Sequence, residues 1–340
     1  MTANMGHAPW HLAWPILKAL ARGMGQAWYS PNAIREQAHK ELATILPPGF
    51  KQTVFVVTGS EAVEVACRSA MKLRPGKAIA HLHGNYHGST TWVQENLNGG
   101  KGASFEWGGP YPEGVGVVIV TPYLAAWCKW ATEDEIEKFS KWVRDELIIL
   151  IDDEIQSGFG RCGTWWGFQR YDGLHPHIIV AGKAATGLLP LSFVSYIDAV
   201  ADFVREEDYI STHSGNPICL AAMNANIAWM RKADAPELAR EIYVEITRVI
   251  DGWWGLENLI MGYDGRGAAV SIYLRSKEQA KQVIDAVSDR VLLFDTGLPL
   301  IKIAPPLNIK CRDLLQGLGI IRDAITGVAG AKSSSQEVTG

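Results

Sequence analysis

Short apolar runs of strand length alternate along the chain with segments of helical periodicity. The clearest helix is Ala131–Glu146, which opens with a capping box formed by Thr132 and Glu135 and carries its apolar residues on one face. This alternation is typical of βαβ units, so we predict an α/β fold with a mostly parallel sheet covered by helices. The predicted strands of this sheet are Val54–Val57, Ala78–Leu82, Val115–Val120, Leu147–Ile151, Ile178–Ala181 and Ser192–Ile197.

The pattern changes after residue 216. Asn216–Arg231 predicts a long helix, and the glycine-rich stretch Gly262–Gly267 predicts a turn. Three further apolar runs predict strands of a smaller α+β lobe: Ala269–Leu274, Val291–Phe294 and Leu300–Ile303. We therefore expect four parts: an N-terminal segment at an interface or in the small lobe (1–30), a large ligand-binding domain (31–230), a small C-terminal domain (231–330) and a polar, disordered tail (331–340).

Composition and charge restrict the class of partner. The chain has 340 residues, of which 47% are hydrophobic, so it can bury a full core. Acidic side chains outnumber basic ones by 36 to 32 without any basic run, and we expect neither nucleic acid nor a membrane as a partner. No apolar stretch reaches the ~18 residues of a membrane span. The five cysteines are odd in number and form no C-x-x-C pair, which favours reduced thiols and a cytoplasmic location.

The stretch VVTGSEAVE has the form of an anion cradle. The apolar run up to Val57 is followed by Thr58, Gly59 and Ser60 and then by an amphipathic helix. A helix start offers unpaired N–H groups, Gly59 allows close approach of the backbone, and Ser60 adds a hydroxyl group. A purely structural alternative is that Ser60, or Thr58 together with Glu61, only caps the helix.

An aromatic residue lies inside the glycine-rich turn GNYHGST. Tyr86 follows the predicted strand Ala78–Leu82 and could lie flat against a planar ligand ring, although an aromatic residue in a turn can equally pack against the core. His81, His83 and His87 suggest a metal site, but no cysteine or carboxylate is placed to complete it, and we expect no metal.

Three consecutive acids, Asp152, Asp153 and Glu154, follow the apolar run Leu147–Ile151. Buried carboxylates without partners are too costly for all three to face the core, and alternation along a strand separates them. If Asp153 faces a ligand cleft, Asp152 and Glu154 point the other way, toward water or backbone donors. Asp153 then needs a cation, either on a ligand or on an internal partner such as Arg161.

A lysine ends another predicted strand. In IIVAGKAATG, Lys183 follows Gly182 and precedes small residues. Burial there lowers the pKa of its ammonium group and prepares the amine to attack a carbonyl. Together these groups supply a phosphate cradle, an aromatic plate, a carboxylate for a ring nitrogen and an amine for an aldehyde. One cofactor requires this set, pyridoxal 5'-phosphate, and the cation that Asp153 needs is its protonated pyridine ring.

The chain also resembles the class III (ornithine/ω-type) aminotransferases, enzymes of pyridoxal phosphate fold type I. The similar elements occur in the same order: GHAPW at 6–10, TGSEAVE at 58–64, YHG at 86–88, DEIQSGFGRCG at 153–163, AGKAATGLLPLS at 181–192, STHSGNP at 211–217 and IAPPLNI at 303–309. The resemblance implies that Lys183 forms the Schiff base and that Asp153 pairs with the pyridinium. The other cofactor contacts that it implies are the phosphate on Gly59 and Ser60, ring stacking by Tyr86, the ring hydroxyl on Gln156 and, from the neighbouring subunit of a homodimer, a phosphate contact by Thr212.

The chain departs from the family pattern at three points. Strands that precede the GH element in the family and help to wall the substrate pocket are expected to be missing, so this is a shortened member. Thr121 and Pro122 stand where the family often has Glu-Pro. Lys302 stands where many members have an arginine that clamps a substrate carboxylate, and lysine lacks the bidentate fork of that arginine.

The expected reaction is ping-pong transfer of an amino group from an amine or amino acid to a carbonyl acceptor, with Lys183 as the proton-transferring base. Asp153 stabilises the carbanion by keeping the ring nitrogen protonated. Alternative outcomes of the same carbanion are racemisation or epimerisation, an intramolecular amino shift and decarboxylation. A shortened relative that binds the cofactor without turnover is a further alternative.

Overall fold

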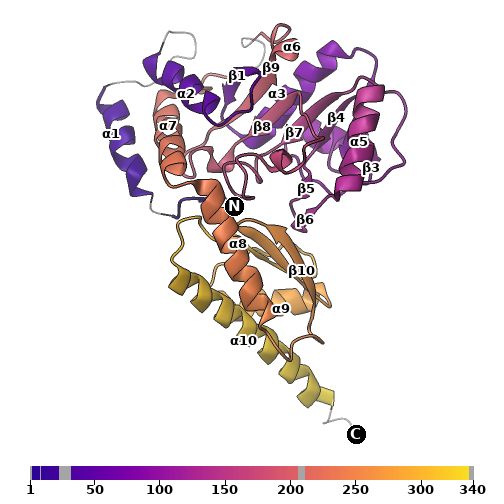
Figure 1. Ribbon diagram of the computed structural model, residues 1–340, viewed down its shortest axis with the longest axis vertical. Coiled ribbons are helices and arrows are strands. Elements are labelled where there is room, and N and C mark those ends of the chain that lie inside the picture. Colours follow the sequence, from indigo (N-terminus) through magenta and orange to yellow (C-terminus); the bar gives the residue numbers. More distant parts are fainter. Residues whose placement is uncertain (1, 8, 23–31, 206–210, 337–340) are drawn as a thin grey trace.

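The protein is described by a computed structural model, which covers residues 2–7, 9–22, 32–205 and 211–336. Two main sheets with helices packed on them occupy opposite ends of the molecule (Figure 1). The elements up to residue 232 are η1 (Trp10–Leu12), α1 (Ala13–Ala21), α2 (Ala33–Ala43), β1 (Phe50–Val56), α3 (Gly59–Leu73), β2 (Ala78–Leu82), α4 (Thr91–Asn96), β3 (Ala103–Phe105), β4 (Val115–Val120), β5 (Tyr123–Leu124), β6 (Lys129–Trp130), α5 (Glu133–Asp145), β7 (Ile149–Asp153), η2 (Gly167–Arg170), β8 (Ile178–Ala181), η3 (Lys183–Ala185), β9 (Ser192–Ile197), α6 (Asp198–Ala201) and α7 (Pro217–Lys232). The later elements are α8 (Ala235–Asp251), β10 (Ile260–Arg266), β11 (Ala269–Leu274), α9 (Lys277–Val287), β12 (Leu300–Ile303) and α10 (Cys311–Gln336).

The large sheet has seven strands in the order β1-β9-β8-β7-β4-β2-β3. β9 is antiparallel to both of its neighbours, whereas the pairs from β8 to β3 are all parallel. The sheet is therefore mostly parallel, as predicted from the sequence. Because β2, β4, β7 and β8 run in one direction, their carboxyl ends meet at one edge of the sheet, where ligands of such sheets bind.

Alternating residues of the strands feed two separate cores. Ile149 and Ile151 of β7 belong to the cluster under α3, whereas Leu150 belongs to the cluster on the other face, together with residues of α2, α5 and α7. Both faces of the central strands are therefore covered, which explains why these strands read as continuous apolar runs rather than as an alternating pattern.

Local signals for helix starts are confirmed. The predicted helix Ala131–Glu146 is α5, and Thr132 and Glu135 form the expected capping box. A second capping box, formed by Thr58 and Glu61, starts α3. The long helix predicted from Asn216 is α7, for which the Asn216 side chain is the N-cap and accepts from the backbone N–H of Ile218.

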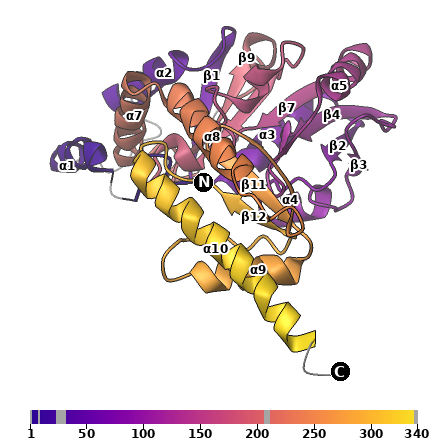
Figure 2. The same ribbon diagram turned by 60° about the horizontal axis from the view of Figure 1, so that its bottom comes forward.

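The second sheet has the order β10-β11-β12 and is antiparallel. α8 leads from the large sheet to this one, and α9 and α10 pack beside each other on it (Figure 2). The predicted turn Gly262–Gly267 was wrong, because most of it is strand β10. Its glycines permit close strand pairing: a Cβ at Gly265 would lie 2.2 Å from the carbonyl oxygen of Ala269.

Two other expectations about the C-terminal part need correction. Val291–Phe294 was predicted as a strand but is irregular. Val291 and Leu293 pack partly buried against the core and Leu292 and Phe294 are exposed, but the segment pairs with no strand of the described sheets. α10 continues to Gln336, although we expected disorder from Ala331; alanine and lysine, which start this tail, are good helix formers. Residues 337–340 lie outside the described part.

The proposed division at residue 230 stays a prediction, as does the role of segment 1–30, of which 1, 8 and 23–30 lie outside the described residues. Within the ranges that the structure describes, no helix is long and apolar enough to cross a membrane.

Candidate active site

Four strands of the large sheet deliver polar residues to the same edge. Asp153 ends β7, Lys183 directly follows β8, Thr121 directly follows β4, and the loop with Tyr86 and His87 follows β2. β1 leads at the same edge into the start of α3. The sheet order places these groups side by side, as the positions of strand ends predicted.

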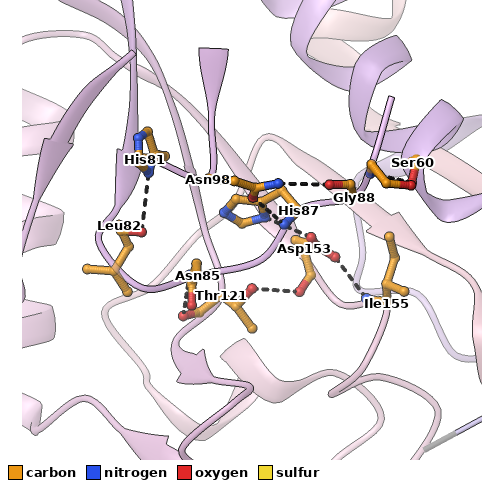
Figure 3. Close-up of polar contacts among 11 residues, drawn as sticks. Ser60, His81, Leu82, Asn85, His87, Gly88, Asn98, Thr121, Asp153 and Ile155 are labelled. Carbon is orange, nitrogen blue, oxygen red and sulfur yellow. Dashed lines mark hydrogen bonds and ion pairs between the residues drawn. The ribbon is translucent and has the colours of Figure 1, made fainter. Parts of the chain in front are cut away.

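The Asp153 carboxylate is buried and held from two sides (Figure 3). Its Oδ2 lies 2.8 Å from Nδ1 of His87, and its Oδ1 accepts from the backbone N–H of Ile155 at 3.1 Å. Thr121 donates its hydroxyl to the carbonyl oxygen of Asp153 at 3.2 Å. A proton on Nδ1 of His87 is the assignment that satisfies the carboxylate.

Arg161 is not the partner of Asp153. It is buried, and its guanidinium group donates to Asn4 and to the carbonyl oxygens of Ala268 and Pro305. Burial lowers the pKa of Arg161 to about 10. Arg161 therefore connects the large domain to the N-terminal segment and to the small domain.

Asp152 and Glu154 point away from Asp153, as strand alternation predicted. Both side chains are fully buried, so the expectation that they could reach water was wrong. Glu154 accepts from the Ser157 hydroxyl and from the backbone N–H of Phe168, whereas no N–H or hydroxyl donor of the described residues reaches Asp152. Burial, and then the charge of Glu154, raise the pKa of Asp152 well above its ordinary value. Burial and the neighbouring charge of Glu154 therefore both favour the protonated form of Asp152.

Lys183 has a left-handed backbone, with φ of +37°, a conformation that is uncommon outside glycine. Asn226 of α7 is buried and holds this turn by donating its side-chain amide to the carbonyl oxygens of Ala184 and Ala185. Burial lowers the pKa of the Lys183 amine, the nearby charge of Asp153 raises it, and that of Lys302 lowers it. Lys183 and Asp153 therefore lie at the carboxyl ends of two neighbouring parallel strands, near enough for their charges to interact.

The start of α3 packs against the loop that follows β2, and Thr58 with Glu61 caps the helix, as the structural alternative predicted. Ser60 accepts from the backbone N–H of Ser89 at 3.0 Å, so it binds a second loop rather than capping its own helix, which Thr58 caps. A Cβ at Gly88, whose φ is +127°, would lie 2.6 Å from the Ser60 hydroxyl oxygen. Only glycine permits this approach of the two loops. Asn98 fixes the second loop by donating to the carbonyl oxygen of Gly88 and accepting from the N–H of His87.

The remaining predicted cofactor residues lie at the rim. The Tyr86 side chain is 55% exposed, next to His87, so its ring is accessible to a ligand. Gln156 is half-buried in the turn after Asp153, and Thr212 is exposed in the loop before α7. Their roles stay predictions.

Lys302 lies on β12 and contacts the β5–β6 hairpin of the large domain. Its Nζ donates to the carbonyl oxygen of Ala125 and lies 5.4 Å from the centre of the Tyr123 ring. Burial lowers the pKa of Lys302. The Tyr123 hydroxyl lies 3.1 Å from Sγ of Cys128. The ammonium group of Lys302 therefore already has an acceptor within the protein. To bind a substrate carboxylate, it must give up its hydrogen bond to the carbonyl oxygen of Ala125.

The donor set suits pyridoxal phosphate. Helix N–H groups and Ser60 suit the phosphate, Asp153 suits a protonated ring nitrogen, and Lys183 has a pKa lowered toward the neutral amine that attacks an aldehyde. The three histidines of the β2 region do not form a metal site: His87 binds Asp153, and nowhere in the described residues do three or more His, Cys, Asp or Glu side chains gather to hold a metal.

Residues 115–325 match the family model for class-III aminotransferases. The chain belongs to this family. It is 27% identical over 321 residues to a LysW-aminoadipate semialdehyde/glutamate semialdehyde transaminase of Sulfurisphaera tokodaii (86% of this chain, 79% of the relative). It is 28% identical over 311 residues to an ornithine aminotransferase of Exiguobacterium (82% and 76%). An S-selective transaminase from Bacillus megaterium shares the fold with a TM-score of 0.87 at 20% identity, covering 96% of this chain and 87% of that one.

These findings confirm the resemblance. The protein is a class-III aminotransferase, an enzyme that transfers amino groups with pyridoxal phosphate. The reading as a non-catalytic relative is set aside. Sequence reasoning missed His87, Asn98 and Asn226, the three side chains that hold the site in place. One signal could have pointed to His87. A buried carboxylate such as Asp153 needs a partner within the protein as well as a ligand, and His87 is that partner.

Proposed function

We propose that this aminotransferase takes the amino group of a terminal amine, on an amino acid or a plain amine, and passes it to a carbonyl acceptor by a ping-pong mechanism. The relatives support a terminal position, because their names specify semialdehydes and ornithine. The placement of Lys183 and Asp153 at neighbouring strand ends carries the proposal: it combines an amine whose pKa is lowered by burial with a carboxylate held by His87.

Bound pyridoxal phosphate supplies the electron sink of the reaction. Asp153 holds a proton at the ring nitrogen of the cofactor, and His87 keeps the Asp153 carboxylate oriented toward it. The amine of Lys183 would accept the proton from the substrate carbon that bears the transferred amino group and would deliver it to the cofactor side of the reacting group. Gly59 and Ser60 bind the phosphate through the start of α3, Tyr86 covers the ring, and Gln156 contacts the ring hydroxyl.

Lys302 is the group that we propose for a substrate carboxylate. Its lowered pKa and its contact with Ala125 weaken it as an anchor in comparison with an arginine. We therefore expect substrates without a carboxylate near the reacting amine to be accepted as well.

We further propose a cytoplasmic homodimer in which Thr212 contacts the phosphate in the neighbouring site. Exposed Trp10, Trp14 and Leu17, on η1 and α1, supply apolar surface for a second subunit. Mixed dimers of Lys183→Ala and Thr212→Asp subunits test this. If Thr212 acts across the interface, each mixed dimer regains one complete site; if it acts within its own chain, mixing restores no activity.

Single turnover of the holoenzyme with ornithine, alanine and hexylamine tests the reaction itself. We expect the aminated cofactor and a carbonyl product to accumulate together, fastest with ornithine or hexylamine. Deuterium exchange at Cα with inverted product would instead indicate racemisation, and loss of carbon dioxide would indicate decarboxylation.

A further inference from the structure

A second cavity of about 790 Å³ lies at the opposite edge of the large sheet. It is lined by Ile149 at the start of β7, by His177 just before β8 and by Arg74 just after α3. α6 also lines it and lies at the end of the large domain that faces away from the small domain (Figure 1). Cavities of a few hundred to a thousand cubic ångströms are typical of small-molecule sites. Lys183 and Asp153 are at the other ends of these strands, so the cavity is separate from the cofactor site.

Most of the cavity wall is apolar. Leu147 and Phe203 are 70% and 66% exposed although they border the cavity. The backbone of Leu147 is left-handed, with φ of +52°, which a bulky residue rarely adopts. Water therefore has access to an apolar surface formed by Leu73, Val143, Leu147, Ile148, Val200 and Phe203.

The polar groups of the cavity are donors. Nε of Arg74 and the hydroxyl of Ser140 are buried and have no hydrogen-bond partner among the described residues, whereas Nη2 of Arg74 donates to the carbonyl oxygen of Leu147. Ser140 is only 5% exposed. Nδ1 of His177 accepts from the backbone N–H of Leu150 at 3.0 Å, which leaves Nε2 as the protonated nitrogen. Buried donors without acceptors are costly, and an incoming acceptor would relieve that cost.

The charge of the cavity is positive in a chain whose net charge is −4. Arg74 and Arg144 line it, no acidic side chain does, and in the described part of the chain neither arginine forms an ion pair. A neighbouring hollow of about 420 Å³ shares Ser140 and Arg144 and contains three acids, Glu133, Glu137 and Asp172. An anionic group is therefore favoured on the Arg74 side, away from these acids.

We propose that this cavity binds a small carboxylate with an apolar body, with the head group on Arg74 and the body against the apolar wall. Arginine matches the planar fork of a carboxylate, and the apolar wall gains from removal of the body from water. This site is independent of the proposed amino transfer, because it contains none of the groups that the reaction uses.

Calorimetric titration of the holoenzyme with octanoate tests the proposal, with octylamine and 1-octanol as probes of the same chain length. We expect saturable binding of octanoate at least about tenfold tighter than that of either other probe. Absence of saturable octanoate binding, or equal binding of octylamine, would overturn the proposal.

Two variants locate the binding. Ala199 is an exposed residue of α6 that lines the cavity, and Ala199→Trp fills the space without disturbing the core. Arg74→Gln removes the charge, and Arg275→Gln, on an exposed arginine of the small domain, is the matched control. We expect the first two to weaken octanoate binding by at least about tenfold and the control to leave it unchanged. Unchanged affinity in Ala199→Trp would contradict the assignment even if Arg74→Gln fails to fold.

Discussion

Nδ1 of His87 lies 2.8 Å from Oδ2 of Asp153, and both side chains are buried. The carboxylate that we propose for the ring nitrogen of the cofactor is thus held by a protein donor before any ligand arrives. Pre-orientation of this kind lets the negative charge act on the ring nitrogen without reorganisation during the reaction.

Replacement of His87 tests this orientation. His87→Ala should leave a buried carboxylate without its side-chain partner and lower kcat by roughly 10–100-fold, as loss of outer partners does at other sites. Steady-state kinetics and the visible absorbance of the holoenzyme measure the effect. His83→Ala, on an exposed histidine of the same loop, should change neither, and an equal loss in both variants would contradict a specific role of His87.

The pKa of Lys183 gives a directional prediction. Burial lowers this pKa, the charge of Asp153 raises it, and the charge of Lys302 lowers it. Capture of pyridoxal phosphate by the apoenzyme should therefore rise with pH around a midpoint below 10.5. Lys302→Met should move that midpoint upward and Asp153→Asn should move it downward. Lys302→Arg keeps the charge and should leave it close to the wild-type value. Stopped-flow pH profiles measure these midpoints. Shifts in the opposite directions would refute the influence of Asp153 and Lys302 on the Lys183 amine.

Lys183→Ala should abolish the adduct that borohydride traps on the protein. Lysine is the nucleophile that the mechanism requires, and the amine of Lys183 is the one whose pKa the charge of Asp153 influences. Peptide mass spectrometry of reduced holoenzyme checks the site. An adduct that persists on another lysine would remove Lys183 from the mechanism.

Asp152 should limit stability at neutral pH. Its pKa in the folded state is raised above the ordinary 3.8, so the folded protein binds the proton more tightly than the unfolded chain does. The stability that this proton binding contributes is complete below pH 3.8 and is lost as the pH rises through the pKa of Asp152 in the folded state. Asp152→Asn should therefore raise the free energy of unfolding at pH 8 by roughly 1–4 kcal/mol and have little effect below pH 4. Urea unfolding at several pH values measures this. Exposed Asp172→Asn is the control, and a gain in both variants would be inconsistent with burial as the cause.

Gly88→Ala should close the phosphate cradle. Its Cβ would lie 2.6 Å from the Ser60 hydroxyl oxygen, so cofactor affinity should fall by more than about tenfold. Gly84→Ala is a matched control, because Gly84 also has a left-handed φ of +77° but an added Cβ meets nothing within 4 Å. Gly84→Ala should cost only about 1–2 kcal/mol of backbone strain and should keep cofactor affinity. Fluorescence titration with pyridoxal phosphate distinguishes the two.

Much of the site was predictable because strand ends and helix caps are local signals. The apolar run before Asp153 and the glycine before Lys183 placed both residues at the carboxyl ends of parallel strands, where the sheet order brings them together. The capping box of Thr58 and Glu61 likewise depends on a spacing of three residues. The sequence by itself therefore determined the α/β sheet, the helix starts and the polar groups that gather at the carboxyl edge of the sheet.

Tertiary structure decided which polar groups face each other across elements that are distant in the chain. His87 reaches Asp153 across 66 positions, Lys302 donates to Ala125 across 177, and Asn226 supports the Lys183 turn from a separate helix. Two further features depend on contacts between distant elements in the same way. They are the strand pairing of the glycine-rich β10 and the set of donors around the second cavity. Periodicity reports which face of one element is apolar, whereas the partner of a buried charge depends on the packing of several elements, which no short stretch of sequence contains.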